Sequence, residues 1–154
     1  MDYVTVKWLH VLSSTLLFGT GIGTAFYMFF ASLSRDPRVV FTVAKYVVIA
    51  DWLFTATSAV FQPVSGFYLA ALAGYPLVSR WIVWSTALYL LAGACWLPVV
   101  WMQIRMREMA GCAVEAGTEL PRRYWRYFRV WILLGIPAFL ALVVVFYLMV
   151  AKPV

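Results

Sequence analysis

Two titratable side chains stand inside long apolar stretches of this chain. His10 is its single histidine, and Asp51 is the one charged residue between positions 46 and 73. A neutral imidazole can ligate haem iron or accept a proton, and a carboxyl group can relay one. An ionisable group inside a membrane costs a few kcal/mol, so it usually faces the interior of a helix bundle. His10 and Asp51 are therefore the candidate catalytic residues.

Polar residues accompany both candidates at the three- and four-residue steps that keep side chains on one face of a helix. Ser14 follows His10 on the first such face. The longest polar series lies in the second apolar segment and consists of Asp51, Thr55, Ser58, Gln62 and Ser65. A comparable face in the third segment consists of Ser85, Tyr89, Ala92, Trp96 and Gln103. We expect the first three apolar segments to share a polar interior. The last segment has no polar stripe and would close the bundle as a wall.

The depth of each residue follows from the helical rise of about 1.5 Å per residue. It places His10, Ser65 and Tyr89 in one layer near one membrane surface, and Asp51 near the opposite surface. His10 and Asp51 are then too far apart to form a direct acid–base pair. The predicted cofactor-binding residues are His10, Lys7, Ser14, Gln62, Ser65, Arg80 and Tyr89.

The same residues also allow structural explanations. His10 can simply hydrogen-bond to a neighbouring helix, and Asp51 can reach the membrane surface or pair with a loop cation such as Arg105. Gly19 and Gly23 form a G-x-x-x-G pair, which is typical of close helix packing in membranes. The pair also predicts a homo-oligomer that associates through these two glycines.

Four apolar segments are long enough to hold these residues within a lipid bilayer. The chain is 65% apolar and 12% charged, whereas a soluble domain is about a quarter charged. About 20 apolar residues in a helix cross the hydrocarbon core, and segments 4–33, 46–73, 81–104 and 130–151 meet this length. Backbone groups in lipid must pair within each segment, which predicts helices. The expected fold is an all-α membrane protein, a four-transmembrane-helix bundle that forms one domain over residues 1–154.

Positive charges predict the orientation of this bundle. Nine of the 12 Lys and Arg residues lie in the first connection and in a loop over residues 105–129. Such residues collect on the cytoplasmic side, so both termini are expected on the non-cytoplasmic side. Tyr124, Trp125, Tyr127 and Phe128 alternate with arginines in this loop, and we expect them to anchor it among lipid headgroups. The cations do not form one basic face, so nucleic acid is not an expected partner.

The segment VKWLHVLSSTLLFGTGIGTAFYMFFA, with Lys7 three residues before His10, resembles the opening helix of the HemJ-type protoporphyrinogen oxidases. Nearly the whole chain, including ADWLFTATSAVFQPVSG from Ala50 to Gly66, looks closer to a group of predicted bacterial integral membrane proteins of unknown function. The first resemblance implies a multi-pass protein of the bacterial inner membrane that binds haem b through His10. Those oxidases carry a further histidine where Tyr27 to Phe30 stand here, which weakens the implied oxidase activity more than the implied haem binding.

The sequence therefore predicts an inner-membrane redox protein associated with haem b or a quinone, with His10 as the haem-iron ligand or the proton acceptor. Lys7 and Arg80 would pair with haem propionates. A zinc site of the usual kind would need a second histidine, which the sequence does not contain. The G-x-S-x-G motif of hydrolases is also missing from the sequence. The alternative is a non-enzymatic membrane component, which is either a structural subunit or a small-solute permeation module.

Overall fold

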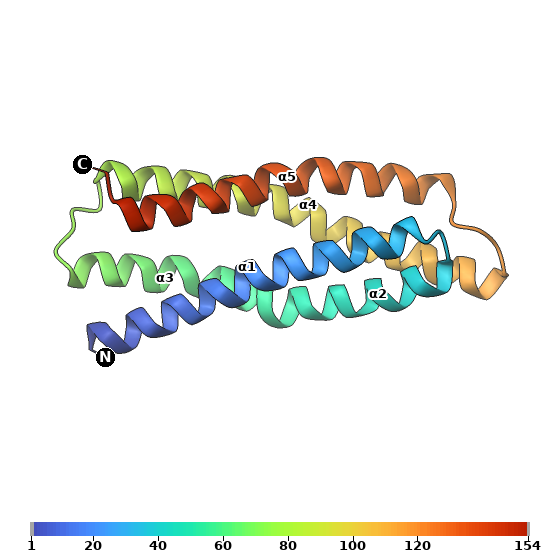
Figure 1. Cartoon of the computed structure of the whole chain (residues 1–154), viewed down its shortest axis with the longest axis horizontal. Coiled ribbons are helices and arrows are strands. Elements are labelled where there is room, and N and C mark those ends of the chain that lie inside the picture. Colours follow the sequence, from blue (N-terminus) through green and yellow to red (C-terminus); the bar gives the residue numbers. More distant parts are fainter. Residues whose placement is uncertain (1, 154) are drawn as a thin grey trace.

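The structure, a computed structural model, describes residues 2–153 and is entirely helical over that range, apart from short connections. Its elements are α1 (Tyr3–Leu33), α2 (Pro37–Ala50), the π-helical turn η1 (Asp51–Ala56), α3 (Thr57–Leu72), α4 (Arg80–Ala116) and α5 (Arg122–Ala151). Because α2, η1 and α3 follow one another without a break, the chain forms four long rods (Figure 1). Each rod is long and apolar enough to cross a membrane. The predicted fold class, an all-α bundle of four membrane-spanning helices, is confirmed.

The rods run alternately up and down, so both termini lie at one end of the bundle (Figure 1). We call this end, which also holds the connection 73–79, the terminal end. The opposite end holds the connections 34–36 and 117–121, and we call it the arginine end. The side of the membrane that each end occupies stays a prediction from the positive charges.

Local sequence signals explain where the rods begin and end. Asp36 caps α2, because its Oδ1 accepts a hydrogen bond from the Arg38 backbone N–H at 2.8 Å, and Pro37 occupies the first helical position. Gly117 ends α4 with a left-handed φ of 64°, a conformation that glycine adopts without a steric penalty.

The segment 105–129, expected as a loop, is helical except at residues 117–121. The helices thus extend beyond residues 104 and 130, where the sequence places the membrane boundaries. Those boundaries stay predictions, since a helix can continue past the lipid.

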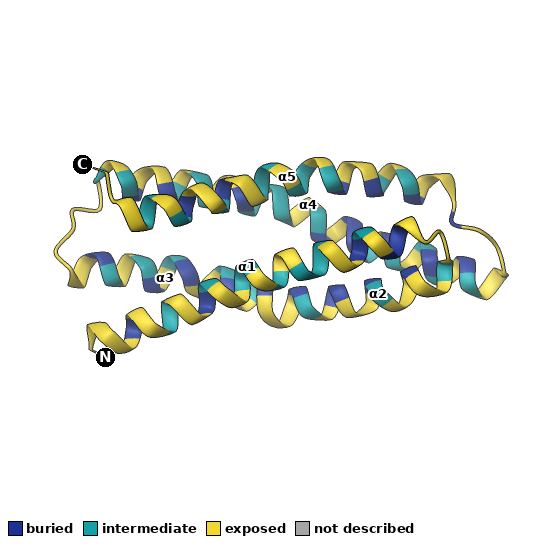
Figure 2. Cartoon of the chain, viewed as in Figure 1, coloured by how far each residue is buried: buried dark blue, intermediate teal, exposed yellow. Residues whose placement is uncertain are grey.

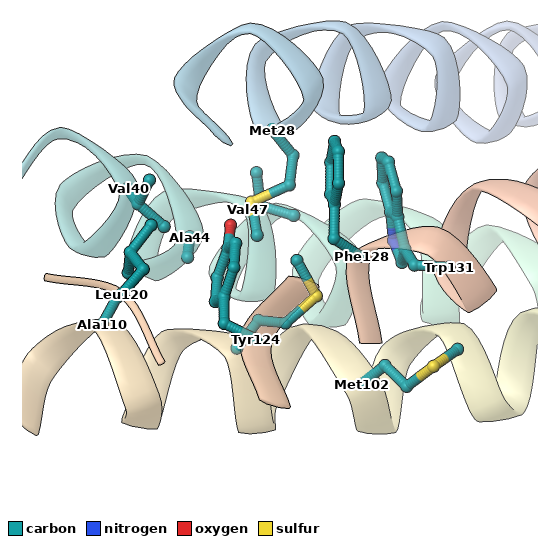
Figure 3. Close-up of a cluster of buried hydrophobic side chains, with 11 residues drawn as sticks. Met28, Val40, Ala44, Val47, Met102, Ala110, Leu120, Tyr124, Phe128 and Trp131 are labelled. Atoms are coloured by element: carbon teal, nitrogen blue, oxygen red, sulfur yellow. The ribbon is translucent and has the colours of Figure 1, made fainter. Parts of the chain in front are cut away.

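A cluster of buried side chains fills the bundle toward the arginine end (Figure 3). Tyr124 is fully buried, and its hydroxyl lies 2.6 Å from the hydroxyl oxygen of Ser32. Phe128 is also buried and stacks on Trp131 with 5.9 Å between ring centroids. The prediction that Tyr124 and Phe128 anchor a loop among lipid headgroups is therefore wrong. Because α5 begins already at Arg122, these rings fall on its inward face.

Exposed residues cover the outer faces of all four rods (Figure 2). Many of them are large and apolar, such as Val60, Leu97 and Leu133, each more than 60% exposed. An apolar surface of this extent is the surface that acyl chains solvate.

Candidate functional site

Two adjoining cavities lie between the pair α1–α3 and the pair α4–α5, because α3 and α4 diverge away from the arginine end (Figure 1). We call the first the terminal cavity; its volume is about 230 Å³, and it includes Ser14, Gln62 and Ser85 in its lining. The second, the central cavity, measures about 540 Å³ and reaches from Leu142 to Asp51. Phe18 and Tyr89 line both cavities, so the two form one cleft.

His10 takes part in a hydrogen-bond chain that joins α1 to α3. Its Nδ1 lies 2.7 Å from the Ser65 hydroxyl oxygen, and that hydroxyl donates its proton to the carbonyl of Phe61 at 2.7 Å. A serine hydroxyl has one proton and the Phe61 carbonyl can only accept, so we assign His10 the tautomer in which Nδ1–H donates to Ser65. The other ring nitrogen, Nε2, then carries the lone pair, the form that can ligate a metal or accept a proton.

Two further residues of α3 fix the position of His10. The side-chain amide of Gln62 donates a hydrogen bond to the backbone carbonyl of His10 at 2.9 Å. Gly66 lies beside the imidazole, and a Cβ atom added there would lie 3.4 Å from His10 Cε1, which is van der Waals contact. The structure thus brings His10 and Ser65 together, as the depth estimate predicts, and Gln62 joins them from the next turn of α3.

Tyr89 connects α4 to α3 across the cleft. Its hydroxyl donates a hydrogen bond to the carbonyl of Ala59 at 2.8 Å. Pro63 lies four residues after Ala59 and has no N–H, so this carbonyl lacks its usual helical partner. The tyrosine thereby satisfies a backbone group that proline leaves free inside the membrane.

The remaining predicted residues take part in other contacts. Ser14 lines the terminal cavity, and its hydroxyl donates to the carbonyl of Val11 at 2.7 Å. Lys7 is exposed, with its Nζ 5.7 Å from the ring centroid of Tyr3. Arg80 is exposed at the first residue of α4. The two cations thus stand at the terminal end, outside the hydrogen-bond group of His10.

Asp51 opens the π-helical turn η1 and is 3% exposed. Its Oδ1 accepts a hydrogen bond from the Thr55 hydroxyl at 3.1 Å, and its carboxyl also interacts with the side chain of Gln103 on α4. The alternative in which Asp51 pairs with Arg105 is wrong, because Arg105 binds Glu108 at 2.9 Å. Asp51 therefore belongs to a polar group separate from that of His10.

Two side chains that line the central cavity each have a buried polar atom without a hydrogen-bond partner among the residues described. These atoms are Oε1 of Gln103 and Nε1 of Trp131, on side chains that are 3% and 6% exposed. Leaving such a group unpaired costs about 1–3 kcal/mol. Trp131 was not among the predicted site residues, although it follows Phe128 by three positions and so shares its helix face.

Glycines create much of the space in the central cavity. Gly93 and Gly135 line it, and a Cβ atom added at either position would meet no atom within 4 Å. An added Cβ at Gly19 or Gly23 would also meet nothing within 4 Å. Packing of these last two glycines against another helix of the same chain is therefore not found, because the neighbouring rods contact α1 on other faces. Association of two copies through them stays a prediction.

A family model described as "Predicted integral membrane protein (DUF2269)" matches residues 4–153. This match agrees with the resemblance that covers nearly the whole chain and brings no support for a likeness to the HemJ-type oxidases. Neither a curated protein nor a solved structure matches the chain significantly. Within the described residues, no cluster of three or more His, Cys, Asp or Glu side chains suited to a metal ion occurs.

Proposed function

We propose that this chain, which belongs to that family of predicted integral membrane proteins, is a multi-pass protein of the bacterial inner membrane that binds a lipid-soluble molecule of the quinone class. The central cavity is the observation that carries the proposal. Its volume of about 540 Å³ falls within the range of about 300–1,000 Å³ that is usual for small-molecule sites.

The lining of this cavity suits a ligand with an apolar body and a small polar head. Aromatic and aliphatic side chains make up most of the wall, including Phe18, Phe29 and Trp96. The polar groups are few, and they include Tyr89 at one end of the cavity and Asp51 near the other end. A quinone has such a composition, because its ring oxygens are polar and the rest of the molecule is apolar.

His10 supplies a proton acceptor close to this cleft. Its hydrogen bond to Ser65 leaves Nε2 with the lone pair. Gly66, which lies beside the imidazole, and Gln62, which binds the His10 carbonyl, both line the terminal cavity.

Haem b fits the described residues less well than a quinone. Nε2 of His10 has the lone pair that an axial ligand needs. However, His10 lines neither cavity, and the cavity nearest to it measures only about 230 Å³. A rigid macrocycle would have to separate α1 from α3, which the bonds of His10 to Ser65 and Gln62 hold together. We therefore assign no chemistry to haem here.

The permeation alternative has less support than ligand binding. A path for small solutes must be continuous from one end of the bundle to the other. Toward the arginine end, Met28, Met106 and Tyr124 are fully buried and fill the space between the rods. The cleft therefore ends inside the bundle.

Binding of decylubiquinone to protein in lipid nanodiscs tests the proposal, with quenching of tryptophan fluorescence as the measurement. Gly93→Leu fills the central cavity and is expected to weaken binding about tenfold or more. Gly23→Leu is the matched control, because it adds the same side chain on a helix face outside both cavities. Wild-type protein that does not bind the quinone, or equal loss in both variants, would contradict the proposal. An intense Soret band from purified protein, abolished in His10→Ala, would favour haem instead.

A further inference from the structure

Two aromatic and two arginine side chains form a patch where α4 and α5 pack together. The rings of Trp101 on α4 and Tyr127 on α5 lie with 5.6 Å between their centroids. The guanidinium carbon of Arg105 lies 5.7 Å from the centroid of the Trp101 ring. That of Arg123 lies 5.3 Å from the centroid of the Tyr127 ring. We call these four side chains the arginine–aromatic patch.

The patch is open at the surface of the protein. Trp101 is 49% exposed, the side chain of Arg105 is 51% exposed, and Arg123 is exposed as well. Arg105 donates a hydrogen bond from Nη1 to Glu108 at 2.9 Å. Arg123 donates from Nε and Nη2 to the Tyr127 hydroxyl at 3.2 and 2.8 Å. Each guanidinium group has five N–H donors, so both keep donors without a partner among the residues described.

The order of these side chains along the rods matches the layers of a membrane surface. α4 runs toward the arginine end, and α5 runs away from it (Figure 1). Arg105 follows Trp101 on α4 by one helical turn, and Arg123 precedes the other ring by one turn on α5. The Cα atoms of the arginines are therefore about 6 Å closer to the arginine end than those of the aromatic residues. Tryptophan and tyrosine prefer the boundary between acyl chains and headgroups, which puts the arginines at the level of the phosphates.

We propose that the arginine–aromatic patch binds the headgroup of an anionic phospholipid. The guanidinium groups donate hydrogen bonds to phosphate oxygens, whose geometry and charge they match, while the two rings contact the adjoining part of the acyl chains. Two cations stand here beside one carboxylate, that of Glu108, so the patch favours a lipid with a net negative charge. None of the four side chains lines either cavity, so this lipid site is independent of the proposed quinone site.

Retention of lipids in native mass spectrometry tests the proposal. Protein in a mild detergent is mixed with equal amounts of dioleoylphosphatidylglycerol and dioleoylphosphatidylcholine. The two lipids share their acyl chains and the phosphate, but only phosphatidylglycerol has a net negative charge. We expect wild-type protein to retain phosphatidylglycerol about tenfold more than phosphatidylcholine. Equal retention of the two lipids by wild-type protein overturns the inference without reference to any variant.

Two double variants with the same change in net charge locate the site. Arg105→Gln with Arg123→Gln removes both guanidinium groups of the patch and should lower the preference to about twofold or less. Arg38→Gln with Lys45→Gln removes two exposed cations of α2 and should leave most of the preference intact. Equal loss in both double variants would show that the total charge alone attracts the lipid. A preference that survives loss of the patch arginines would place the lipid elsewhere, and either result overturns the assignment.

A lysine variant separates the shape of the arginines from their charge. Arg105→Lys with Arg123→Lys keeps both charges but removes the planar groups that lie over the rings and bind phosphate in a bidentate manner. Its preference for phosphatidylglycerol should fall between those of the wild-type protein and of the glutamine variant. An undiminished preference would overturn the role of the rings.

An acidic protein segment is the competing partner for these arginines. Wild-type protein that shows no lipid preference but binds poly-L-glutamate through Arg105 and Arg123 would assign the patch to such a segment and overturn the lipid site. Thermal unfolding of each variant shows that a lost preference does not reflect a lost fold.

Discussion

The arginine end and the open cleft of this bundle bury their side chains in opposite ways. At the arginine end α2 and α4 approach closely, and the ring of Phe41 would lie 3.0 Å from a Cβ atom at Gly111. In the cleft, a Cβ atom added at Gly93 or Gly135 would have no other atom within 4 Å. Both regions use glycine, but the first uses it to bring helices together and the second leaves space beside it. The arginine end is thus closely packed, whereas the cleft is open.

Few contacts hold the cleft at its width. The ring of Phe18 on α1 stacks on Phe139 of α5, with 5.3 Å between centroids, and Tyr89 of α4 binds the Ala59 carbonyl of α3. Both Phe18 and Tyr89 lie where the two cavities meet. Because so few groups bridge the layers there, a small change at Tyr89 should alter the cleft more than it alters the arginine end.

Loss of a core side chain at the arginine end should have the largest effect on stability. Phe128→Ala removes a buried ring that packs on Trp131 and Tyr124. Truncations of this kind cost about 3–5 kcal/mol, because the surrounding side chains fill the space only in part. Thermal unfolding in detergent measures the loss. Phe26→Ala is the control, since Phe26 is 55% exposed on α1. Equal destabilisation by both variants would show that the arginine end is not the main packed core.

The bond between Tyr89 and Ala59 should have a smaller effect, which depends on Pro63. Tyr89→Phe removes the donor to a buried carbonyl and is expected to cost about 1–2 kcal/mol. In a Pro63→Ala background, residue 63 regains its N–H and can bond the Ala59 carbonyl within the helix. In that background, Tyr89→Phe should lower the free energy of unfolding by clearly less than it does in the wild-type protein. A double-mutant cycle followed by thermal unfolding measures this coupling, and strictly additive costs would contradict the explanation.

The sequence predicts the polar interior well because burial of a polar group in a membrane is costly. Asp51, Gln62 and Ser65 repeat at helical steps, and all three are buried in the structure. The rise per residue also places His10 at the level of Ser65, and the two side chains are hydrogen-bonded. A sequence is therefore enough to predict a contact when both residues must face inward and their helices must lie side by side.

Helix ends and the spacing between helices were not predictable in the same way. Residues Arg105 to Ala116 stay helical because arginine, methionine, glutamate and alanine all favour helices, and a polar sequence does not by itself end one. The positive-inside rule concerns the membrane boundary and contains no information on backbone structure. Similarly, the pair Gly19 and Gly23 indicates a flat helix surface but not which helix packs on it. The cleft itself depends on the divergence of α3 from α4, for which the sequence offers no simple signal.

Substitution of glycine by alanine should have the smallest effect and should differ between the two regions. Alanine stabilises a helix by up to about 1 kcal/mol relative to glycine. Gly135→Ala adds a methyl group to open space in the central cavity, so we expect the protein to gain most of this stability. Gly111→Ala brings its methyl group to 3.0 Å from the ring of Phe41, which must move away, so the gain should be cancelled or reversed.

Thermal unfolding of these two alanine variants compares the regions with a single chemical change. Phe41→Ala provides the control, because removal of the ring should restore the gain at position 111 and leave the effect at position 135 unchanged. If both alanines stabilise the protein equally while Phe41 is present, the arginine end tolerates added volume as readily as the cleft does. The glycine at 111 would then not be a requirement for the approach of α2 to α4, and the contrast between a packed end and an open cleft would rest on the cavities alone.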